Sequence, residues 1–311
     1  MSDLARLVVI LGPTASGKSA LGIELAQRMG GEILVCDSTQ VYRHFDIGTA
    51  KVPPAEQRGI PHHLIDLVEP DAVFTAGQYR QRALEVLNDL SGRQKTPIIT
   101  AGTGLYLRAL LEGLADAPAR SEELRERLRE RARRNGPASL HRLLVRLDFE
   151  AAARIAPRDT QKVIRAIEIR ILAGKPVGEI YQSGRSPLQG YEVRKIGLLP
   201  PRARLYARID SRVEAMMKTG WIAEVRELIR SGVRADAKPF QFIGYSELRM
   251  QIEAGRDPLD AVSAIRQATR RFAKRQLTWF RKEPAVSWLT GFGDDPEILE
   301  SALKIAEAKS S

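Results

Sequence analysis

The stretch Gly12-Pro13-Thr14-Ala15-Ser16-Gly17-Lys18-Ser19 decides the fold, because it fits the phosphate-loop pattern GxxxxGK[ST]. It lies between an apolar run at residues 5–11 and residues 19–29, whose apolar side chains recur at helical spacing. Glycines let the backbone N–H groups converge on phosphate oxygens, and the following helix N-terminus adds positive potential. Lys18 supplies a cation, and the Ser19 hydroxyl a ligand for Mg²⁺. The loop predicts a diphosphate or triphosphate ligand; the alternative is a tight turn without ligand.

Short apolar runs alternate with helical spacing through the first part of the chain. The runs at residues 5–11, 32–36 and 97–100 read as buried parallel strands, and another follows at 194–199. This alternation predicts an α/β fold with a doubly wound parallel sheet as the P-loop core. Ligands of such sheets bind beyond the carboxyl ends of the strands, where Asp37 and Thr103 stand.

The segment Asp37-Ser38-Thr39-Gln40-Val41-Tyr42 is rich in side chains that form hydrogen bonds. In phosphate-loop enzymes an acidic residue after an apolar strand helps to hold the metal, so Asp37 is a candidate for that role or for a base. A carboxylate beside neutral polar side chains also suits the reading of a nucleobase edge. The alternative is that Asp37 only caps the following turn.

The pattern changes after about residue 115. Residues 120–134 hold seven Arg and four Glu, which predicts an exposed helix with ion pairs along its surface. Helical spacing continues over 138–173, and glycines and prolines interrupt it up to residue 190. We therefore expect a mainly helical insertion domain at 116–190 within a core formed by 1–115 and 191–311.

Composition narrows the class of protein. The chain has 311 residues, of which 43% are hydrophobic, and a single cysteine, Cys36, which excludes an internal disulfide and a thiolate zinc site. No apolar run approaches the length of a membrane helix, so we expect a cytoplasmic protein, without a membrane partner and monomeric. The net charge of +11 favours a polyanionic partner, although codon bias toward arginine is an alternative.

The strongest basic feature is the segment 258–282. Between residues 261 and 282 there are seven basic residues and no acidic one. At helical spacing, the rows are Arg266, Arg270 and Lys274, and Arg271 and Arg275, opposite a predicted core face of Val262, Ile265, Phe272 and Trp279. A stripe of one sign favours contact with nucleic-acid phosphates.

Several segments, in chain order, resemble the tRNA dimethylallyltransferase family. They are GPTASGKS at 12–19, DSTQVY at 37–42, PHHLID at 61–66, GTGLY at 102–106, QKVIRAIEI at 161–169, LYARID at 205–210, FQFIGYSEL at 240–248 and ATRRFAKRQLTWFRK at 268–282. The phosphate loop alone is shared with unrelated enzymes, whereas DSTQVY, GTGLY and the last segment together are far more specific. Ala101 and Phe242 depart from the family pattern, and neither is assigned to chemistry.

Members of that family attach an isoprenoid to the N6 amine of the adenosine immediately 3′ of the anticodon. The resemblance implies that Gly12, Pro13, Thr14, Ala15, Ser16, Gly17, Lys18 and Ser19 bind the diphosphate of dimethylallyl diphosphate rather than ATP, with Mg²⁺ at Ser19. It implies that Asp37 accepts the amine proton or a hydrogen bond, and that Arg208 neutralises the departing diphosphate. Thr103 would help to bind the diphosphate and face the base. The alternatives are a helix cap for Thr103 and a surface position for Arg208.

The family resemblance also predicts where tRNA binds. It implies contact with the segment Gln161, Lys162, Val163, Ile164 and Arg165, in addition to Ser38, Thr39 and Gln40 beside the base. Together with Arg270, Arg271, Lys274 and Arg275, these residues would hold an anticodon stem-loop between insertion and core, with the adenine turned toward Asp37. We expect structural roles for His62, His63 and Cys36.

Three other functions share parts of this pattern. A free-nucleotide prenyltransferase would need the phosphate loop, Asp37 and Thr103, but neither the insertion nor the basic stripe. A small-molecule or nucleotide kinase would share the loop and the sheet. A non-catalytic RNA-binding ATPase would explain the stripe but leave DSTQVY and GTGLY without a role.

Overall fold

The computed structural model describes residues 4–182 and 184–308, which belong to two compact units. The core combines Met1–Leu110 with Gln189–Ser311, and the helical insertion spans Leu111–Leu188. The sequence pattern predicts the insertion at residues 116–190, so the observed bounds differ from the predicted ones by a few residues. Each unit has its own buried hydrophobic cluster.

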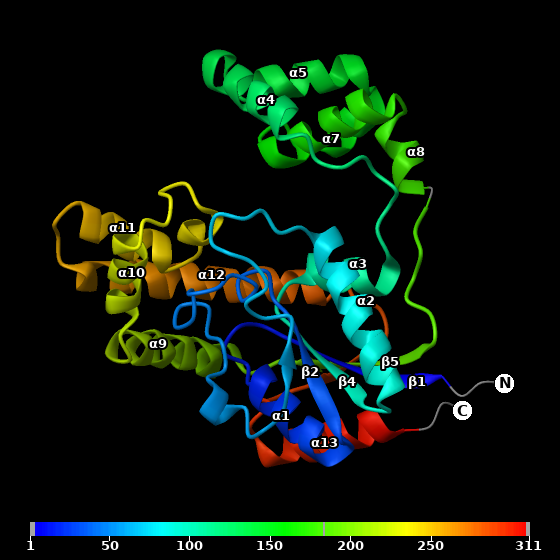
Figure 1. The fold of residues 1–311 in the computed structure, drawn as a ribbon, viewed down its shortest axis with the longest axis vertical. Helices are drawn as coiled ribbons and strands as arrows, with labels where there is room; N and C mark the ends of the chain where they lie inside the picture. Colours follow the sequence, from blue (N-terminus) through cyan, green and yellow to red (C-terminus); the bar gives the residue numbers. More distant parts are fainter. Residues whose placement is uncertain (1–3, 183, 309–311) are drawn as a thin grey trace. The chain divides into compact units, whose positions relative to one another are not determined.

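The described part of the core contains one parallel sheet of six strands in the order β3-β2-β4-β1-β5-β6 (Figure 1). The strands are β1 (Ala5–Leu11), β2 (Gly31–Cys36), β3 (His62–His63), β4 (Thr96–Ala101), β5 (Tyr191–Leu198) and β6 (Val286–Leu289). The predicted α/β class and the four predicted strands are confirmed. The edge strands β3 and β6 were not predicted, because strands of two and four residues are too short to show an apolar run.

Helices lie on both faces of the sheet (Figure 1). Helix α1 (Lys18–Met29) packs with α13 (Pro296–Glu307) on one face, and α2 (Ala76–Gly92) and α3 (Gly104–Glu112) lie on the other. The remaining core helices are α9 (Arg202–Lys218), α10 (Trp221–Arg230), α11 (Tyr245–Glu253) and α12 (Val262–Phe280). Short 3₁₀ turns are η1 (Pro54–Glu56), η2 (Lys238–Gln241) and η3 (Pro258–Ala261).

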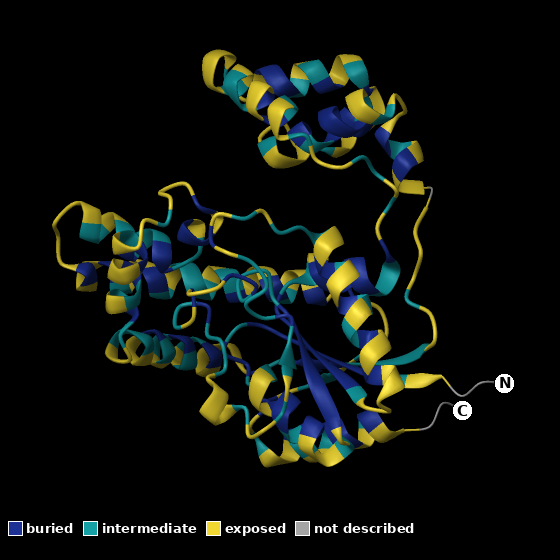
Figure 2. Cartoon of the chain, in the orientation of Figure 1, coloured by how far each residue is buried: buried dark blue, intermediate teal, exposed yellow. Residues whose placement is uncertain are grey.

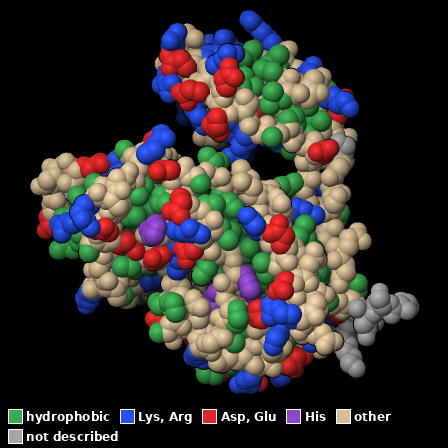
Figure 3. All heavy atoms as spheres, viewed as in Figure 1, with side chains coloured by type: hydrophobic (Ala, Val, Ile, Leu, Met, Phe, Trp, Pro, Cys, Tyr) green, Lys and Arg blue, Asp and Glu red, His purple; other side chains and the backbone are tan. Residues whose placement is uncertain are grey.

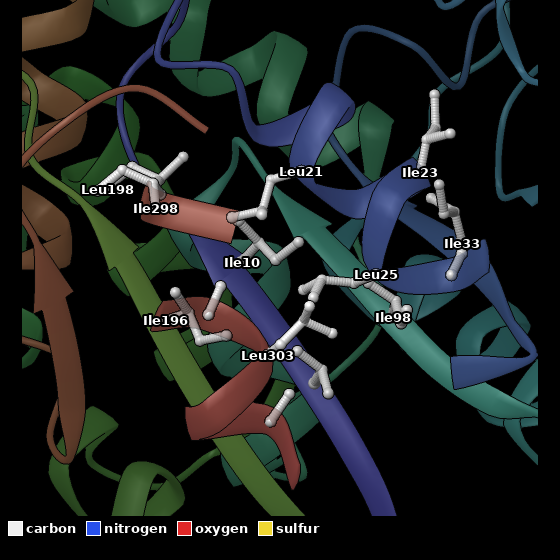
Figure 4. Packing of buried hydrophobic residues seen from close by; sticks show 14 of the residues in the cluster. Ile10, Leu21, Ile23, Leu25, Ile33, Ile98, Ile196, Leu198, Ile298 and Leu303 are labelled. Carbon is white, nitrogen blue, oxygen red and sulfur yellow. The ribbon is translucent and has the colours of Figure 1, made fainter. Parts of the chain in front are cut away.

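The packing of α1 and α13 on the sheet fixes the start of the phosphate loop. Leu21 and Leu25 of α1 meet Ile10 of β1, Ile196 of β5 and Leu303 of α13 in one buried cluster (Figure 4). Strands β1, β2 and β4 are buried over most of their length, as Figure 2 shows. Because β1 and α1 are both anchored in this cluster, the loop between them has fixed ends.

The buried face of helix α12 agrees with the prediction at Ile265 but not at Trp279. Its buried residues are Ile265, Ala273, Gln276 and Phe280. Trp279, predicted to be in the core, is 38% exposed. The prediction was wrong because it counted apolar side chains only, whereas the buried face includes the polar side chain of Gln276.

The insertion consists of α4 (Glu122–Asn135), α5 (Ala138–Leu147), α6 (Phe149–Arg154), α7 (Thr160–Ala173) and α8 (Val177–Gln182). Its core contains Leu128 of α4, Leu144 of α5 and Ile167 of α7. Along α4, Arg133 pairs with Glu126 and Glu130, so the predicted charged helix is confirmed. Figure 3 shows acidic and basic side chains interspersed on this unit.

A buried carboxylate connects the helices of the insertion. The Glu168 side chain of α7 is fully buried, and its oxygens accept hydrogen bonds from Arg125 (2.8 and 2.9 Å), Arg165 (2.6 Å) and the Ser121 N–H (2.8 Å). Burial alone would raise the pKa of Glu168, but these partners prevail and lower it to about 2. The carboxylate therefore ties α7 to the start of α4.

Replacing this carboxylate tests its contribution to stability. In Glu168→Gln, Arg125 keeps a buried charge without its partner, so the insertion should lose about 3 kcal/mol of unfolding free energy. Hydrogen exchange of α4 and α7 amides measures this loss. The matched variant Glu130→Gln, on the exposed face of α4, should change it by less than about 0.5 kcal/mol.

The low pKa of Glu168 predicts how the stability of the insertion depends on pH. Because its folded pKa is about 2 and its ordinary value is 4.5, its contribution is present above pH 4.5 and is lost as the pH falls toward 2. Over this range the protection of α4 and α7 should fall more steeply in the wild type than in Glu168→Gln. Equal slopes would contradict the assignment.

Candidate active site

The loops that follow β1, β2 and β4 open into a cavity of about 750 Å³ in the core. Leu11 and Cys36, the last residues of β1 and β2, both pair with Ala101 of β4, so the three loops begin at the same level. Residues 14–19, Asp37 and Gly102 line the cavity. This is the position where doubly wound sheets bind ligands.

Lys18 lies over the phosphate loop. Its Nζ donates hydrogen bonds to the carbonyl oxygens of Gly12 (2.9 Å) and Pro13 (2.8 Å), two residues that do not themselves line the cavity. Burial lowers the pKa of Lys18 to about 8; the Asp37 carboxylate opposes this effect and the Arg212 guanidinium adds to it. An anionic ligand at the loop would therefore stabilise the charged form of Lys18.

Asp37 has one carboxylate oxygen occupied and one facing the next loop. Oδ1 accepts hydrogen bonds from the Thr39 N–H (2.9 Å) and hydroxyl (2.7 Å), so Asp37 does cap the turn, as the alternative interpretation held. No hydrogen-bond donor among residues 4–182 and 184–308 reaches Oδ2. A Cβ at Gly102 would lie 2.3 Å from Oδ2, so only glycine leaves room for the carboxylate there. The side chain combines a fixed orientation with a free acceptor.

Thr103 is joined to the Asp37 segment rather than to the cavity. Its Oγ1 accepts a hydrogen bond from the Ser38 N–H (2.9 Å) and donates one to the Ser38 hydroxyl (3.2 Å). Thr103 therefore does not use its side chain to cap α3. Thr103 and Ser38 are absent from the cavity lining, whereas Thr39 and Gln40 belong to it.

Arg208 and Arg212 lie one turn apart on α9, and both line the cavity. The Arg208 guanidinium pairs with Asp294 through two hydrogen bonds (2.7 and 2.9 Å) and lies over the ring of Phe292. Arg212 has no hydrogen bond or ion pair within the described part of the chain. Burial and the neighbouring Arg208 lower the pKa of Arg212, and Asp37 opposes them.

Arg212 is the site residue that the sequence analysis missed. The segment quoted for the family, LYARID, ends at Asp210, two residues before it. The signal that points to it is helical spacing: a residue four positions after Arg208 lies on the same face of α9.

The basic stripe of α12 divides into two parts. Arg270 pairs with Asp210 of α9, and Arg266 pairs with Glu214 of the same helix. Arg271, Lys274 and Arg275 are exposed, and Arg275 lines the cavity. Of the four α12 residues predicted to contact tRNA, Arg270 is therefore paired within the core, and its partner comes from another helix, so the sequence of α12 alone does not show it.

The predicted tRNA segment of the insertion is also divided. Gln161 and Lys162 are exposed, but Val163 and Ile164 belong to the hydrophobic core of the insertion. Arg165 pairs with Glu168 and donates to the Pro118 carbonyl oxygen (2.9 Å). The side chains of Val163 and Ile164 are thus unavailable to RNA, because they face inward on α7.

One part of the cavity wall is apolar. It is formed by residues from β2, the 50–65 segment, α9, α10 and the loop before α11: Val35, Val52, Ile65, Val213, Met216, Trp221, Phe242 and Ile243. Cys36 is fully buried in β2, and burial raises the pKa of its thiol to about 12, so it does not act as a nucleophile. The cavity thus offers charged groups together with an apolar surface.

The phosphate loop offers a hydroxyl ligand for Mg²⁺, so a bound phosphate group would have to supply other ligands of the ion. The described residues contain no cluster of three His, Cys, Asp or Glu side chains that could hold a metal. His62 and His63 have separate partners, the Ile60 carbonyl oxygen (2.8 Å) and Glu32 (2.7 Å). The exposed Ser19 hydroxyl in the cavity fits Mg²⁺, which keeps several waters and binds substrate phosphates.

In the described ranges, no helix has both the length and the apolar character needed to cross a bilayer.

Comparisons with known proteins agree with this geometry. The IPP transferase family model matches residues 40–283. The chain is 49% identical over 298 residues to the tRNA dimethylallyltransferase of Solibacter usitatus, covering 96% of each chain. It is 50% identical over 305 residues to that of Koribacter versatilis, covering 98% of this chain and 99% of the relative.

Solved structures give the same result. The full-length tRNA isopentenylpyrophosphate transferase of Bacillus halodurans matches with a TM-score of 0.69 and 36% identity, covering 97% of this chain and 94% of that one. A eukaryotic dimethylallyltransferase acting on tRNA matches with a TM-score of 0.80 and 26% identity, covering 92% and 74%. This chain therefore belongs to the IPP transferase family, together with the tRNA dimethylallyltransferases that it matches.

Proposed function

We propose that this protein transfers the dimethylallyl group of dimethylallyl diphosphate to N6 of the adenosine immediately 3′ of the anticodon in tRNA, and releases diphosphate. One observation carries the proposal: a phosphate loop, the free oxygen of Asp37 and an apolar wall line one cavity in a chain of the IPP transferase family. In the reaction the bond between the allylic carbon and the diphosphate oxygen breaks. A bond from N6 to that carbon forms, and the N6 proton leaves.

The phosphate loop binds the leaving diphosphate. Backbone N–H groups of the phosphate loop after Thr14 and the ammonium of Lys18 meet its oxygens, and Lys18 exchanges its contacts with the Gly12 and Pro13 carbonyl oxygens for them. Arg212 neutralises the charge that develops as the carbon–oxygen bond breaks, because its guanidinium has no competing partner. We give this role to Arg212 in place of Arg208, which Asp294 holds. Mg²⁺, when bound by Ser19 and the diphosphate, adds positive charge to the leaving group.

Asp37 accepts the proton of the attacking amine. Thr39 orients the carboxylate through Oδ1, which leaves Oδ2 as the acceptor for N6. Thr103 acts by holding Ser38, and so the start of this loop, rather than by touching the diphosphate. A base in this position contributes about 10²- to 10⁴-fold to the rate.

The tRNA is bound through exposed basic groups. The exposed side chains Arg271, Lys274 and Arg275 of α12, of which Arg275 lines the cavity, support phosphate contacts at this surface. On the insertion, Gln161 and Lys162 are the exposed members of the predicted segment.

Transfer to RNA is the direct test of this function. The protein with Mg²⁺, dimethylallyl diphosphate and an unmodified anticodon stem-loop should add one prenyl unit to the RNA, measured by mass spectrometry. Asp37→Ala and Lys18→Ala should lower the rate by about 100-fold or more. Asp71→Ala, which removes an exposed carboxylate outside the cavity, should leave the rate unchanged. Phosphate transfer from ATP without prenylation would make the protein a kinase instead.

The role of Arg212 is tested by its effect on the chemical step. Arg212→Met should lower the single-turnover rate by about 100-fold, because positive charge is lost where the leaving group develops negative charge. Arg208→Met should lower the single-turnover rate by a smaller factor, since the Arg208 guanidinium already pairs with Asp294. Arg226→Met, an exposed arginine of α10, serves as the control for charge. A larger loss in Arg208→Met than in Arg212→Met would restore the original assignment.

The basic surface of α12 predicts a salt-dependent contribution to tRNA affinity. Replacing Arg271 and Lys274 by glutamine removes two phosphate contacts, so the slope of log affinity against log salt should fall by about 1.5. Replacing Arg28 of α1 and Lys304 of α13 removes the same charge elsewhere on the core and should leave the slope unchanged. Equal slopes for both double variants would exclude this surface.

A further inference from the structure

Gln276 is a buried amide on α12 that contacts two loops of the cavity. It is 6% exposed and lies one residue after Arg275, on the opposite face from the exposed Arg271 and Lys274. Its Oε1 accepts a hydrogen bond from the Thr14 N–H (2.7 Å), and its Nε2 donates one to the Gly102 carbonyl oxygen (2.9 Å). Thr14 belongs to the phosphate loop, and Gly102 to the loop after β4. An amide suits this position because it is donor and acceptor at once.

The loop after β4 lies beside Asp37 and donates hydrogen bonds to the residue before it. The N–H groups of Gly102 and Thr103 donate to the Cys36 carbonyl oxygen (3.0 Å each), immediately before Asp37. The free oxygen of Asp37 lies against Gly102 itself. Gln276 therefore connects the backbone that binds the diphosphate to the backbone that supports the carboxylate.

A second contact fixes α12 to the same loop. The Trp279 ring approaches the backbone of Gly104 so closely that a Cβ at this position would lie 1.9 Å from its Nε1. Gln276 and Trp279 are three residues apart, so both reach the loop from neighbouring positions on α12. Because the helix is held against the loop at two points, the amide of Gln276 cannot shift with the phosphate loop alone.

We propose that Gln276 is a positioning residue that sets the separation between the diphosphate on the phosphate loop and the carboxylate of Asp37. In this role Gln276 acts through its hydrogen bonds to the Thr14 N–H and the Gly102 carbonyl oxygen, although its side chain also forms part of the cavity lining. Transfer requires the allylic carbon and the attacking amine to meet in one geometry, and a misplacement of about 1 Å costs about 100-fold in rate. The inference rests on the proposed roles of the phosphate loop and Asp37.

Gln276→Glu removes the donor and keeps the acceptor, so the link to Gly102 is lost and a carboxylate faces a carbonyl oxygen. The single-turnover rate at saturating substrates should fall by about 100-fold. The dissociation constant for the RNA should change by less than about threefold, since Gln276 is 6% exposed and lies away from the exposed basic side chains Arg271 and Lys274. Gln276→Met, which keeps the length of the side chain without either hydrogen bond, should give the same pattern. Gln267→Glu makes the same charge change at an exposed position of α12 and should match the wild type.

A double-mutant cycle separates positioning from general damage. If Gln276 acts through the placement of Asp37, then Gln276→Met in the Asp37→Ala background should cost less than about fivefold. If the rate losses of Gln276→Met and Asp37→Ala multiply in the double variant, the inference is overturned. A wild-type rate in both Gln276 variants would also overturn it. Thermal unfolding of each variant serves as the control for folding, and we expect the folded fraction at the assay temperature to be unchanged. A wild-type protein that fails to prenylate RNA would instead refute the proposed function itself.

Discussion

The parallel pairing of β4 with both β1 and β2 is the constraint on which the site depends. Parallel strands all end at the same edge, and the register brings Leu11, Ala101 and Cys36 to one level there. Each residue is followed at once by a functional loop: Gly12–Ser19, Gly102–Gly104 and Asp37–Gln40. A shift of register by one residue would turn the buried side chains of a strand to its other face and move one loop relative to the others. The hydrophobic cluster between the sheet, α1 and α13 therefore stabilises the geometry of the cavity as well as the fold.

The sequence was sufficient for those parts of the molecule that local order determines. The phosphate loop, the strands before it and after it, and the charged helix α4 depend on spacing between near neighbours, so their patterns are visible within about 20 residues. Asp37 and the loop at 102–104 could be placed at one edge because connections in parallel sheets follow a fixed rule. The turn cap that was the alternative for Asp37 is present at its Oδ1, and its role as a base or a metal ligand stays a prediction.

The errors share a physical cause, which is that partners distant in sequence decide what a side chain does. Asp210 and Glu214 pair with Arg270 and Arg266 from α9, so a one-signed stripe in the sequence is partly neutral in the structure. Asp294 likewise pairs with Arg208, whereas Arg212 has no hydrogen bond or ion pair among residues 4–182 and 184–308. Val163 and Ile164 show a different limit: a contiguous motif on a helix presents residues to opposite faces, so its members cannot all contact one partner.

Among the charged side chains that line the cavity of the core, Lys18, Asp37 and Arg212 influence one another. Burial and a neighbouring arginine disfavour the charged forms of Lys18 and Arg212 and so lower their pKa values. The Asp37 carboxylate opposes this effect on both pKa values. Two of these three groups are cations and one is an anion, and the proposed diphosphate would supply further negative charge at the loop. In the proposed reaction, negative charge grows beside Lys18 and Arg212 as the carbon–oxygen bond breaks, and burial there strengthens the attraction. Asp37 would take up a proton in the same step and lose its own charge, so that the two cations would be left to the diphosphate alone. Under the proposed mechanism, the electrostatics of the cavity therefore favour the charge distribution of the products over that of the substrates.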